Sequence, residues 1–417
     1  MLPDTDRLRV LQVNKFFRPG AGAETSFFQT RDLLRRRGHD VIDFAMRHPS
    51  NLPSPYEGYF APERSYDGEG RAITRVRDAT LSIYSVPARK RLARLLAEHR
   101  PDVAHLHNVY HQLTLSVVDE LAAQRVPMVM TLHDWKVACP AYTLFTEGAP
   151  CRRCPTNGFA SAVRHRCVKG SAAASAFAAL EAAVVRQRRT YSKINRFIGP
   201  SRFAVEVAQL GGLDVDRVEH VPNFLPDDEL RPELEPGEVE PRILYVGRLD
   251  VTKGVRELLD AFSLVTVDAQ LRIVGAGALE PEVREAAARD TRISYLGRLD
   301  RERVFEEYAR ALCVTMPSVW EDNGPLVVLE AQAHAKAMIV SDRGGLKEFV
   351  SDGETGRVVR AGHVDDLVRA IEQVVRDPQL ARSWGLRARE RVAAEHSADR
   401  HYERLMAVYR AAMADRT

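Results

Sequence analysis

The sequence has 417 residues, of which 45% are hydrophobic and 28% charged, and its formal net charge is +3. This length exceeds one ordinary hydrophobic core and suits two domains of roughly 200 residues each. The balance is that of a water-soluble globular protein, and no run approaches the ~20 apolar residues of a membrane-spanning helix. Residues 1–10 include acidic side chains and no apolar stretch of signal-peptide length, so we expect a cytoplasmic protein.

Short runs rich in β-branched residues alternate with amphipathic stretches along most of the chain. Helical-length segments separate these runs, which predicts βαβ units and therefore parallel sheets covered by helices. The strand-like runs lie at residues 8–16, 41–46, 102–107, 126–134 and 194–201 in the first half, and at 241–249, 269–277, 292–297, 313–318 and 337–342 in the second.

The alternation stops and restarts once, at residues 225–241, a surface loop rich in proline and acidic side chains. We therefore predict an α/β protein of two doubly wound, Rossmann-like domains, with the cleft between them as the natural ligand site. Residues 1–214 form the N-terminal domain and residues 215–397 the C-terminal one. The last segment, 398–417, has apolar residues at helical spacing, and we expect it to pack back on the N-terminal domain.

A glycine-containing loop follows the first strand, within residues 13–27, and Gly22 stands just before a helix. Glycine lets a backbone approach a ligand closely, and the free amides of a helix N-terminus favour an anion. The fingerprint G-x-G-x-x-G is not completed, because Thr25 stands where its third glycine belongs. Residues 275–280 fail in the same way, with Glu280 in the last place. Both loops can be read as tight turns, and the two failures disfavour a nicotinamide oxidoreductase.

Two basic side chains lie in residues 247–262, directly after the first strand of the second half. Arg248 ends this strand and Lys253 comes at the start of the next helix. A guanidinium fork and an ammonium group beside a helix N-terminus suit a diphosphate. The alternative is that both side chains are solvated on a surface loop.

Acidic residues lie in a further loop and helix, at residues 317–336. Glu321 and Asp322 follow a strand, and Glu330 lies about two turns into the next helix, between apolar neighbours. Carboxylates accept hydrogen bonds from the vicinal hydroxyls of a ribose or hexose, and the helix N-terminus supplies amides. The alternative for Glu330 is a structural pair with an arginine.

These segments, in this order and spacing, resemble the large retaining GT-B family called glycosyltransferase family four. The motifs are the glycine loop, GRLDVTKG, the acid pair at x7 spacing, HNVYHQLT, VMTLHD, GPSRFAVE, VPNFL, SDRGGLKEFVSDGETG and the final helix. The resemblance covers essentially the whole chain. It implies transfer of a hexose-type sugar from a nucleotide-diphosphate donor to a hydroxyl acceptor, without a metal cofactor and with no nucleic-acid partner.

The resemblance also implies roles for individual residues. Arg248 and Lys253 would hold the donor diphosphate, Glu330 the ribose, and His133 would lie beside the transferred sugar and the acceptor. Donor contacts would further come from Gly22, Gly324 and Leu326. The x7 spacing from Glu330 ends on Asp322, one methylene shorter than the family's glutamate, and AQAHAKAMIV lacks the usual proline after lysine.

The mechanism implied is stabilisation of the departing diphosphate by Arg248, Lys253 and helix amides. We favour front-face attack by the acceptor hydroxyl, with the donor phosphate taking its proton, because no acid is assured beneath the anomeric carbon. A retaining phosphorylase would need a lysine for pyridoxal phosphate, which the sequence does not identify. A catalytically inactive homologue that binds nucleotide sugars stays open as the alternative.

Histidines gather at residues 105–111, and His105 and His107 share one side of a strand-like run. A metal site is one interpretation of this pattern. Histidines that donate and accept hydrogen bonds along the ligand cleft are the interpretation we favour.

Four of the five cysteines form the pattern C-x11-C-x2-C-x12-C, whose C-x2-C knuckle suits tetrahedral zinc. The alternatives are unpaired structural cysteines or a disulfide pair. A zinc site would be structural and would shape the acceptor side of the protein. The residues are Cys139, Cys151, Cys154 and Cys167.

These motifs do not identify the acceptor. Residues 86–101 form an amphipathic segment with leucines on one side and basic residues on the other, which suits an anionic membrane surface or an ordinary surface helix. We therefore favour a lipid-linked acceptor that serves cell-surface polysaccharide assembly, and a peripheral position at the inner face of the membrane.

Overall fold

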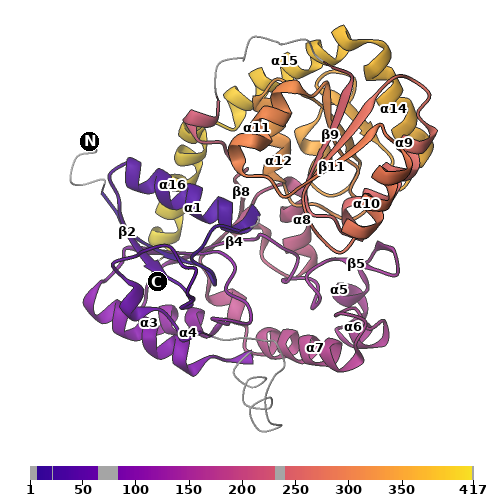
Figure 1. Ribbon diagram of the computed structural model, residues 1–417. Helices are drawn as coiled ribbons and strands as arrows, with labels where there is room; N and C mark the ends of the chain where they lie inside the picture. Colours follow the sequence, from indigo (N-terminus) through magenta and orange to yellow (C-terminus); the bar gives the residue numbers. More distant parts are fainter. Residues whose placement is uncertain (1–6, 21, 64–82, 231–239, 416–417) are drawn as a thin grey trace. The chain divides into compact units, whose positions relative to one another are not determined.

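The computed structural model describes residues 7–20, 22–63, 83–230 and 240–415. The chain divides into two compact units. Unit 1 comprises residues 1–143, 152–221 and 402–417, and unit 2 comprises residues 144–151 and 222–401. Within the described ranges, each unit is built on a six-stranded sheet with helices on both faces (Figure 1).

The sheet of unit 1 is parallel throughout, in the order β2-β1-β3-β4-β7-β8. Most strand positions are buried on both faces, as expected for a parallel sheet covered by helices. The order reverses beside β1, which creates the kind of switch point where α/β proteins bind ligands. The strands are β1 (Arg9–Val13), β2 (Asp40–Phe44), β3 (Val103–Leu106), β4 (Met128–Thr131), β7 (Arg196–Gly199) and β8 (Val218–His220).

Serine caps begin several helices of unit 1. The side chains of Ser85, Ser171 and Ser201 each accept a hydrogen bond from the backbone amide three residues later, which satisfies a donor that the helix leaves open. The helices are α1 (Gly22–Arg36), α3 (Val86–Glu98), α4 (Ser116–Ala123), α5 (Arg153–Asn157), α6 (Ala160–Arg164), α7 (Ala172–Gln187), α8 (Arg202–Leu210) and α16 (Ala398–Ala414), with single 3-10 turns at Glu57–Tyr59, Thr190–Lys193 and Val215–Arg217.

The C-terminal helix α16 belongs to unit 1 from Tyr402 onward, as the sequence predicts. Its residues Leu405, Met406 and Tyr409 are almost fully buried. They pack with Val10 and Val129 of β1 and β4, among other strand residues, in one hydrophobic cluster. Burial of such side chains stabilises by about 1.5–3 kcal/mol each, so the helix is an integral part of this unit.

Helix α3 confirms the amphipathic helix predicted at residues 86–101. Its apolar residues Leu92, Leu95 and Leu96 are buried, and α3 packs against α4. The apolar side of this helix is therefore part of the core of unit 1 and is not open to a lipid surface.

The sheet of unit 2 is also parallel, in the order β11-β10-β9-β12-β13-β14. Its switch point lies beside β9. The strands are β9 (Arg242–Val246), β10 (Gln270–Val274), β11 (Ile293–Gly297), β12 (Cys313–Met316), β13 (Ala337–Ser341) and β14 (Gly356–Val359); a short hairpin pairs β5 (Phe145–Thr146) with β6 (Ala149–Pro150).

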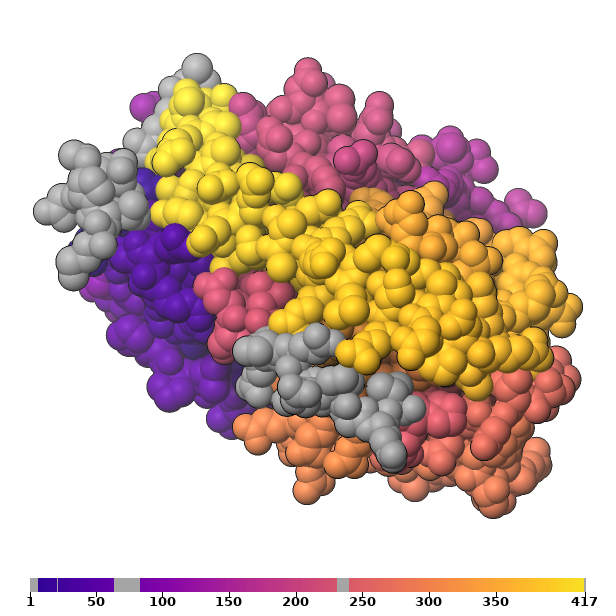
Figure 2. Space-filling view, turned by 90° about the horizontal axis from the view of Figure 1, so that it is seen from above, coloured from indigo at the N-terminus to yellow at the C-terminus, as the bar shows by residue number. Residues whose placement is uncertain are grey.

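Two hydrophobic clusters fill unit 2, one on each face of its sheet. One lies beneath α9, α10 and α14, and the other beneath α11 and α12. Gly385 lets α15 pass close to the chain before β13, where a Cβ would lie 1.9 Å from the carbonyl oxygen of Ala335. The outer side of α15 is exposed (Figure 2, yellow). The helices are α9 (Val255–Leu264), α10 (Glu280–Arg289), α11 (Arg301–Arg310), α12 (Leu326–Ala333), α13 (Leu346–Phe349), α14 (Val364–Arg376) and α15 (Pro378–Glu395), with 3-10 turns at Asp227–Glu229 and Val251–Lys253.

The domain boundary lies in a different place from the one expected at residue 214. Strand β8 (Val218–His220) comes after that point and is hydrogen-bonded to β7, so the chain leaves unit 1 only after Val221. Residues 231–239 of the expected acidic loop lie outside the described residues. Along the part of the chain that the structure describes, no helix is long and apolar enough to cross a membrane.

Candidate functional site

In unit 2 the loops after β9 and β12 are fastened to one another by their backbones. The amides of Val319 and Trp320 donate to the carbonyl oxygen of Thr252, at 3.0 and 3.3 Å. Gly254 has φ +70°, and a Cβ there would lie 1.9 Å from the carbonyl oxygen of Pro317. Only glycine fits this left-handed, crowded position, so the last glycine of the GRLDVTKG motif is required for backbone packing.

Lys253 and Asp322 form a buried ion pair across these two loops. The distance from Lys253 Nζ to Asp322 Oδ1 is 2.5 Å, and the two side chains are 11% and 5% exposed. The ammonium group also lies 5.1 Å from the centre of the Trp320 ring. Among the described residues, the second carboxylate oxygen of Asp322 is buried without a hydrogen-bond partner. A polar ligand that donates to this oxygen would satisfy it.

Arg248 lies differently from Lys253. Its side chain is 60% exposed and pairs with Asp250 at 3.2 Å. Its backbone carbonyl accepts a hydrogen bond from the Tyr245 hydroxyl at 2.7 Å, which fixes the loop while leaving the guanidinium in solvent. The guanidinium is therefore accessible to an anion, and its pair with Asp250 is the weak kind found at surfaces.

The structure separates the two neighbouring acids of the third loop. Glu321 Oε2 accepts the amide of Gly344 at 2.6 Å, so its carboxylate holds the loop after β13. Asp322 instead directs its carboxylate to Lys253, while its carbonyl accepts the amide of Gly345 at 2.7 Å. Of the two acids, Asp322 is the one that carries an open acceptor atom.

Glu330 is half-buried in α12, and the Tyr308 hydroxyl donates to its Oε2 at 3.2 Å. Burial, together with the charge of Glu229, raises the pKa of Glu330 to about 6, although Arg301 partly opposes the shift. Arg301 itself pairs with Glu229. Within the described chain no ion pair is formed by Glu330, so the arginine-paired alternative does not apply.

Gly324 and Leu326 lie at the start of α12. Gly324 has φ +89°, and its carbonyl accepts a hydrogen bond from the Asn223 side chain at 2.8 Å. Pro325 then precedes the helix, which begins at Leu326. The first amides of any α-helix lack partners within the helix, so this end of α12 offers donors to an oxygen-rich ligand.

In unit 1, His133 ends a chain of buried hydrogen bonds that crosses three strands. His133 Nε2 lies 2.8 Å from His107 Nδ1, and His107 Nε2 lies 3.0 Å from Gln12 Oε1. The His107 and His133 rings are stacked, with centroids 5.1 Å apart. Beside this network, the Tyr409 hydroxyl and His105 Nδ1 form a further hydrogen bond of 2.8 Å. The histidines expected to line a cleft are therefore largely buried hydrogen bonders.

These contacts fix the protonation of His133. The oxygen of Gln12 only accepts, so His107 Nε2 carries a hydrogen and His107 Nδ1 is an acceptor. His133 Nε2 must then carry its hydrogen toward His107, which leaves His133 Nδ1 with a lone pair. Burial, and secondarily the charge of Lys15, lowers the pKa of His133 to about 4, so the ring is neutral at pH 7. His133 can accept a hydrogen bond from a hydroxyl.

Gly22 is the first residue of α1 and is exposed. A Cβ at this position would meet nothing within 4 Å. The fold of unit 1 therefore does not itself require glycine here, unlike Gly254 in unit 2. A ligand that approaches the N-terminus of α1 is compatible with this open space.

The cysteine pattern receives no support from the geometry. Cys139 and Cys154 are buried, and Cys151 and Cys167 are half-buried. Over the ranges that the structure describes, no group of three or more His, Cys, Asp or Glu side chains is placed to hold a metal ion. The zinc site stays a prediction from spacing alone.

Sequence reasoning missed several residues that complete these sites. Trp320 lies over Lys253, Tyr308 donates to Glu330, and Gln12 orients His107. Gln12 carries a readable signal, because it is a polar residue in the middle of the apolar strand RVLQV. The other two residues meet their partners only through the fold.

Comparisons with known proteins agree with this architecture. Residues 20–229 match the family model described as Glycosyltransferase Family 4, and residues 226–391 match the one described as Glycosyl transferases group 1. The two Rossmann-like units have the GT-B fold. The chain belongs to glycosyltransferase family 4.

The curated proteins that resemble this chain match only part of its length, at about 30% identity. Alpha-maltose-1-phosphate synthase of Mycolicibacterium smegmatis is 32% identical over 48% of this chain and 58% of its own. Glycogen synthase of Mycobacterium tuberculosis is 29% identical over 64% of this chain and 65% of its own. The chain thus spans less than two thirds of these curated relatives.

Solved structures share the fold along the whole chain. Sucrose-phosphate synthase from Thermosynechococcus elongatus has a TM-score of 0.70 and 20% identity, covering 98% of this chain and 100% of its own. Anabaena HepE in complex with UDP and glucose has a TM-score of 0.68 and 14% identity, covering 96% and 99%.

Proposed function

We propose that the protein is a retaining glycosyltransferase that moves a hexose-type sugar from a nucleoside-diphosphate donor to a hydroxyl acceptor, without a metal cofactor. The observation that carries the proposal is the buried pair of Lys253 and Asp322, which joins the loops after β9 and β12 at the switch point of a Rossmann-like sheet and leaves one Asp322 oxygen open. The family membership supports it, as does the UDP and glucose held by the HepE structure.

The proposed donor contacts follow from charge and geometry. Lys253 and the exposed Arg248 stabilise the negative charge that builds on the departing diphosphate, together with amides at the start of α12. Glu330 as a carboxylate accepts the hydroxyls of the ribose. Asp322 orients Lys253 and offers its open oxygen to a sugar hydroxyl.

The proposed chemistry proceeds on one face of the sugar. The anomeric C–O bond to the diphosphate breaks, the acceptor oxygen bonds to the anomeric carbon from the same side, and the departing phosphate takes the acceptor proton. His133 accepts a hydrogen bond from a hydroxyl of the transferred sugar through its Nδ1. Neutral His133 suits this role, since a protonated ring could not accept at Nδ1.

The acceptor we propose is a lipid-linked precursor of a cell-surface glycan, reached by a protein that works at the inner face of the membrane. No helix among the described residues could span a bilayer, so any membrane contact in this proposal is peripheral.

The test begins with a panel of nucleoside diphosphates, UDP, GDP and ADP, titrated into the full chain in EDTA. One nucleotide should bind, Glu330→Ala should weaken it about tenfold or more, and Lys347→Ala, an exposed lysine in the same unit, should not. Release of that nucleotide from its sugar conjugate then separates an enzyme from a homologue that only binds. Binding that needs Mg²⁺ or Mn²⁺ would contradict the metal-free proposal.

A further inference from the structure

Unit 1 contains a cavity of about 320 Å³ beside helix α7, separate from the residues discussed above. Its volume lies at the lower end of the range of small-ligand sites. Its wall combines side chains from α7 and β7, from the 3-10 turns at Thr190–Lys193 and Val215–Arg217, and from loops near them. The hydrocarbon part of the wall comes from Leu115, Val137, Phe159, Val185, Phe197 and Leu213.

A buried ion pair lies in the wall of this cavity. Lys136 Nζ donates to Glu181 Oε2 at 2.7 Å and to the carbonyl oxygen of Pro140 at 3.1 Å. Both charged side chains are only 5% exposed. The pair neutralises itself, so the buried part of the cavity has no net charge and does not by itself call for an ionic ligand.

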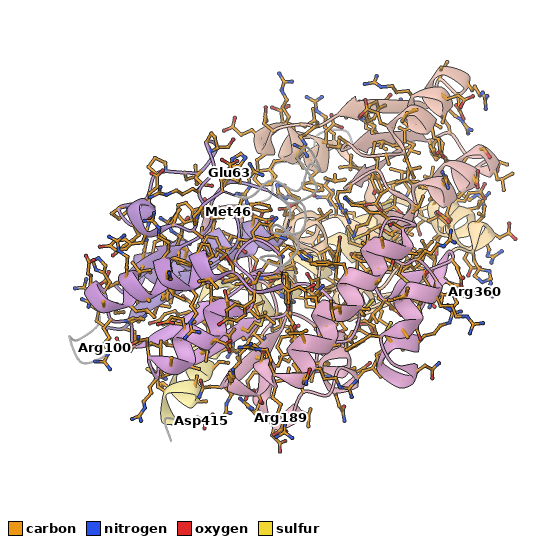
Figure 3. The ribbon with its side chains drawn as sticks, turned by 90° about the horizontal axis from the view of Figure 1, so that it is seen from below. Met46, Glu63, Arg100, Arg189, Arg360 and Asp415 are labelled. Atoms are coloured by element: carbon orange, nitrogen blue, oxygen red, sulfur yellow. The ribbon has the colours of Figure 1, made fainter. Side chains whose placement is uncertain are left out.

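The open part of the cavity is basic. Arg186 and Arg189 line it and are exposed, and Arg217 and one carboxylate, Asp214, line it with them. The side chains of Arg186 and Arg189 form no hydrogen bond or ion pair with another described residue, and the Arg186 guanidinium lies 5.8 Å from the centre of the Phe159 ring. Arg189 has φ +48° at the turn after α7, and it projects from the edge of the molecule in Figure 3. Two unpaired guanidinium groups at the mouth of an apolar cavity suit a phosphate.

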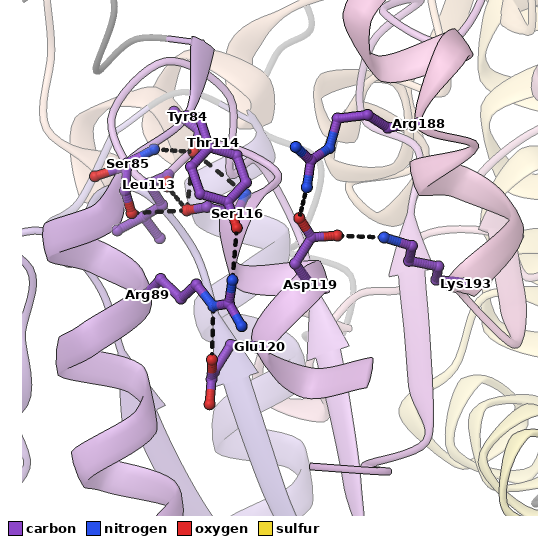
Figure 4. A network of polar contacts seen from close by, with 10 residues as sticks. All are labelled: Tyr84, Ser85, Arg89, Leu113, Thr114, Ser116, Asp119, Glu120, Arg188 and Lys193. Atoms are coloured by element: carbon purple, nitrogen blue, oxygen red, sulfur yellow. Dashed lines mark hydrogen bonds and ion pairs between the residues drawn. The ribbon is translucent and has the colours of Figure 1, made fainter. Parts of the chain in front are cut away.

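Arg188, between these two arginines, is already engaged. Arg188 and Lys193 both pair with Asp119 on α4, at 2.6 and 2.5 Å (Figure 4). This pair of contacts fixes the C-terminal end of α7 to the body of unit 1. Arg186 and Arg189 are consequently presented from an anchored turn, which reduces the entropy lost when they bind an anion.

Helix α7 also exposes an unusual surface. Its exposed positions over the first three turns carry only apolar residues, and Leu180 is 54% exposed. Val215, next in sequence to a residue of the cavity wall, is 44% exposed. Such a contiguous apolar helix face next to arginines is typical of a surface that meets lipid. These exposed residues of α7 are Ala172, Ala173, Ala176, Leu180 and Ala183.

We propose that this cavity binds the hydrocarbon chain of a phosphate-bearing lipid, with the phosphate held by Arg186 and Arg189 and the apolar face of α7 against the bilayer. The lipid is the carrier of the acceptor, so this inference rests on the proposed function and names its substrate class. The cavity is too apolar for a free sugar phosphate, and its basic mouth disfavours a neutral lipid.

The test is calorimetric titration of the full chain with farnesyl phosphate, with farnesol and inorganic phosphate as separate titrants. Farnesyl phosphate should bind at one site, about tenfold or more tighter than either fragment, because apolar burial and phosphate contacts act together. Ala182→Trp should abolish binding by filling the cavity, whereas Ala123→Trp, at an exposed alanine of α4 outside the cavity wall, should not.

A second variant tests the proposal independently, in case Ala182→Trp does not fold. Arg186→Gln/Arg189→Gln should weaken farnesyl phosphate about tenfold or more and leave farnesol unchanged, while Arg166→Gln, an exposed arginine elsewhere in unit 1, should have no effect. Equal binding of inorganic phosphate and farnesyl phosphate, or wild-type binding by both cavity and mouth variants, would overturn the proposal. Loss of nucleotide binding alone would instead count against the donor assignment and leave this site standing.

Discussion

The ion pair between Lys253 and Asp322 predicts that Lys253→Ala damages the fold as well as donor binding. Both side chains are almost completely buried, and the substitution leaves Asp322 charged with neither oxygen paired among the described residues. Removing one partner of a buried ion pair costs about 3–5 kcal/mol. For a unit of this size, each kcal/mol lowers Tm by about 2–4 °C, so we expect a fall of roughly 6–20 °C at pH 7.

The assay is differential scanning calorimetry at pH 7. Lys253→Met/Asp322→Asn should recover at least half of the loss, since it removes both charges together. Lys347→Ala is the matched control and should melt like the wild type. A Lys253→Ala protein with an unchanged Tm would refute the reasoning.

Three further predictions concern Glu330, His133 and the cysteines. The affinity for the nucleotide that binds in the panel should fall as pH drops through about 6, because protonation of Glu330 removes an acceptor, and Glu330→Gln should show no such pH dependence by calorimetry. The free energy of unfolding, measured by chemical denaturation, should fall by up to roughly 3 kcal/mol between pH 6.5 and pH 4 on account of His133. The reason is that the unfolded state binds more protons than the folded state in this pH range, and His133→Gln should flatten the dependence of the unfolding free energy on pH. If the cysteine spacing does bind zinc, elemental analysis should find about one zinc per chain and Cys154→Ser should lower Tm; a metal-free protein with an unchanged Tm would remove the zinc prediction.

The sequence predicts the fold well where local pattern and burial agree. Alternating strand-like and helical runs predict both parallel sheets, and apolar spacing predicts that the C-terminal helix packs on unit 1. It predicts the boundary less well, because the three-residue strand β8 is too short to carry a readable pattern. That strand exists because its backbone completes the edge of a sheet built by residues far away in the chain.

The candidate site shows the same division. Motif spacing singles out Lys253 and Asp322 separately, but only the fold brings residues 69 positions apart into one ion pair. The tautomer of His133 depends on Gln12, more than a hundred residues earlier in the chain, through His107. Such long-range polar contacts leave no periodic signal in a single sequence. Their partners and protonation states can therefore be identified only from the structure.

Helices α3 and α7 show a limit of amphipathic patterns. The leucines of residues 86–101 suggest a lipid-facing helix, yet in α3 these leucines are buried in the core of unit 1. Helix α7, half of whose residues are alanine, shows no strong pattern but leaves several apolar residues exposed. Periodicity identifies the apolar side of a helix, whereas the packing of the whole unit decides whether that side meets protein or solvent.

The central claim is that this chain transfers a sugar with retention and without a metal. The most direct measurement is proton NMR of the wild-type protein in EDTA, mixed with the sugar conjugate of the nucleotide that binds and an extracted lipid-phosphate acceptor. The account predicts release of the nucleoside diphosphate and a product whose anomeric proton keeps the donor's configuration. An inverted product, or intact donor despite tight nucleotide binding across the whole panel of sugar conjugates, would contradict it.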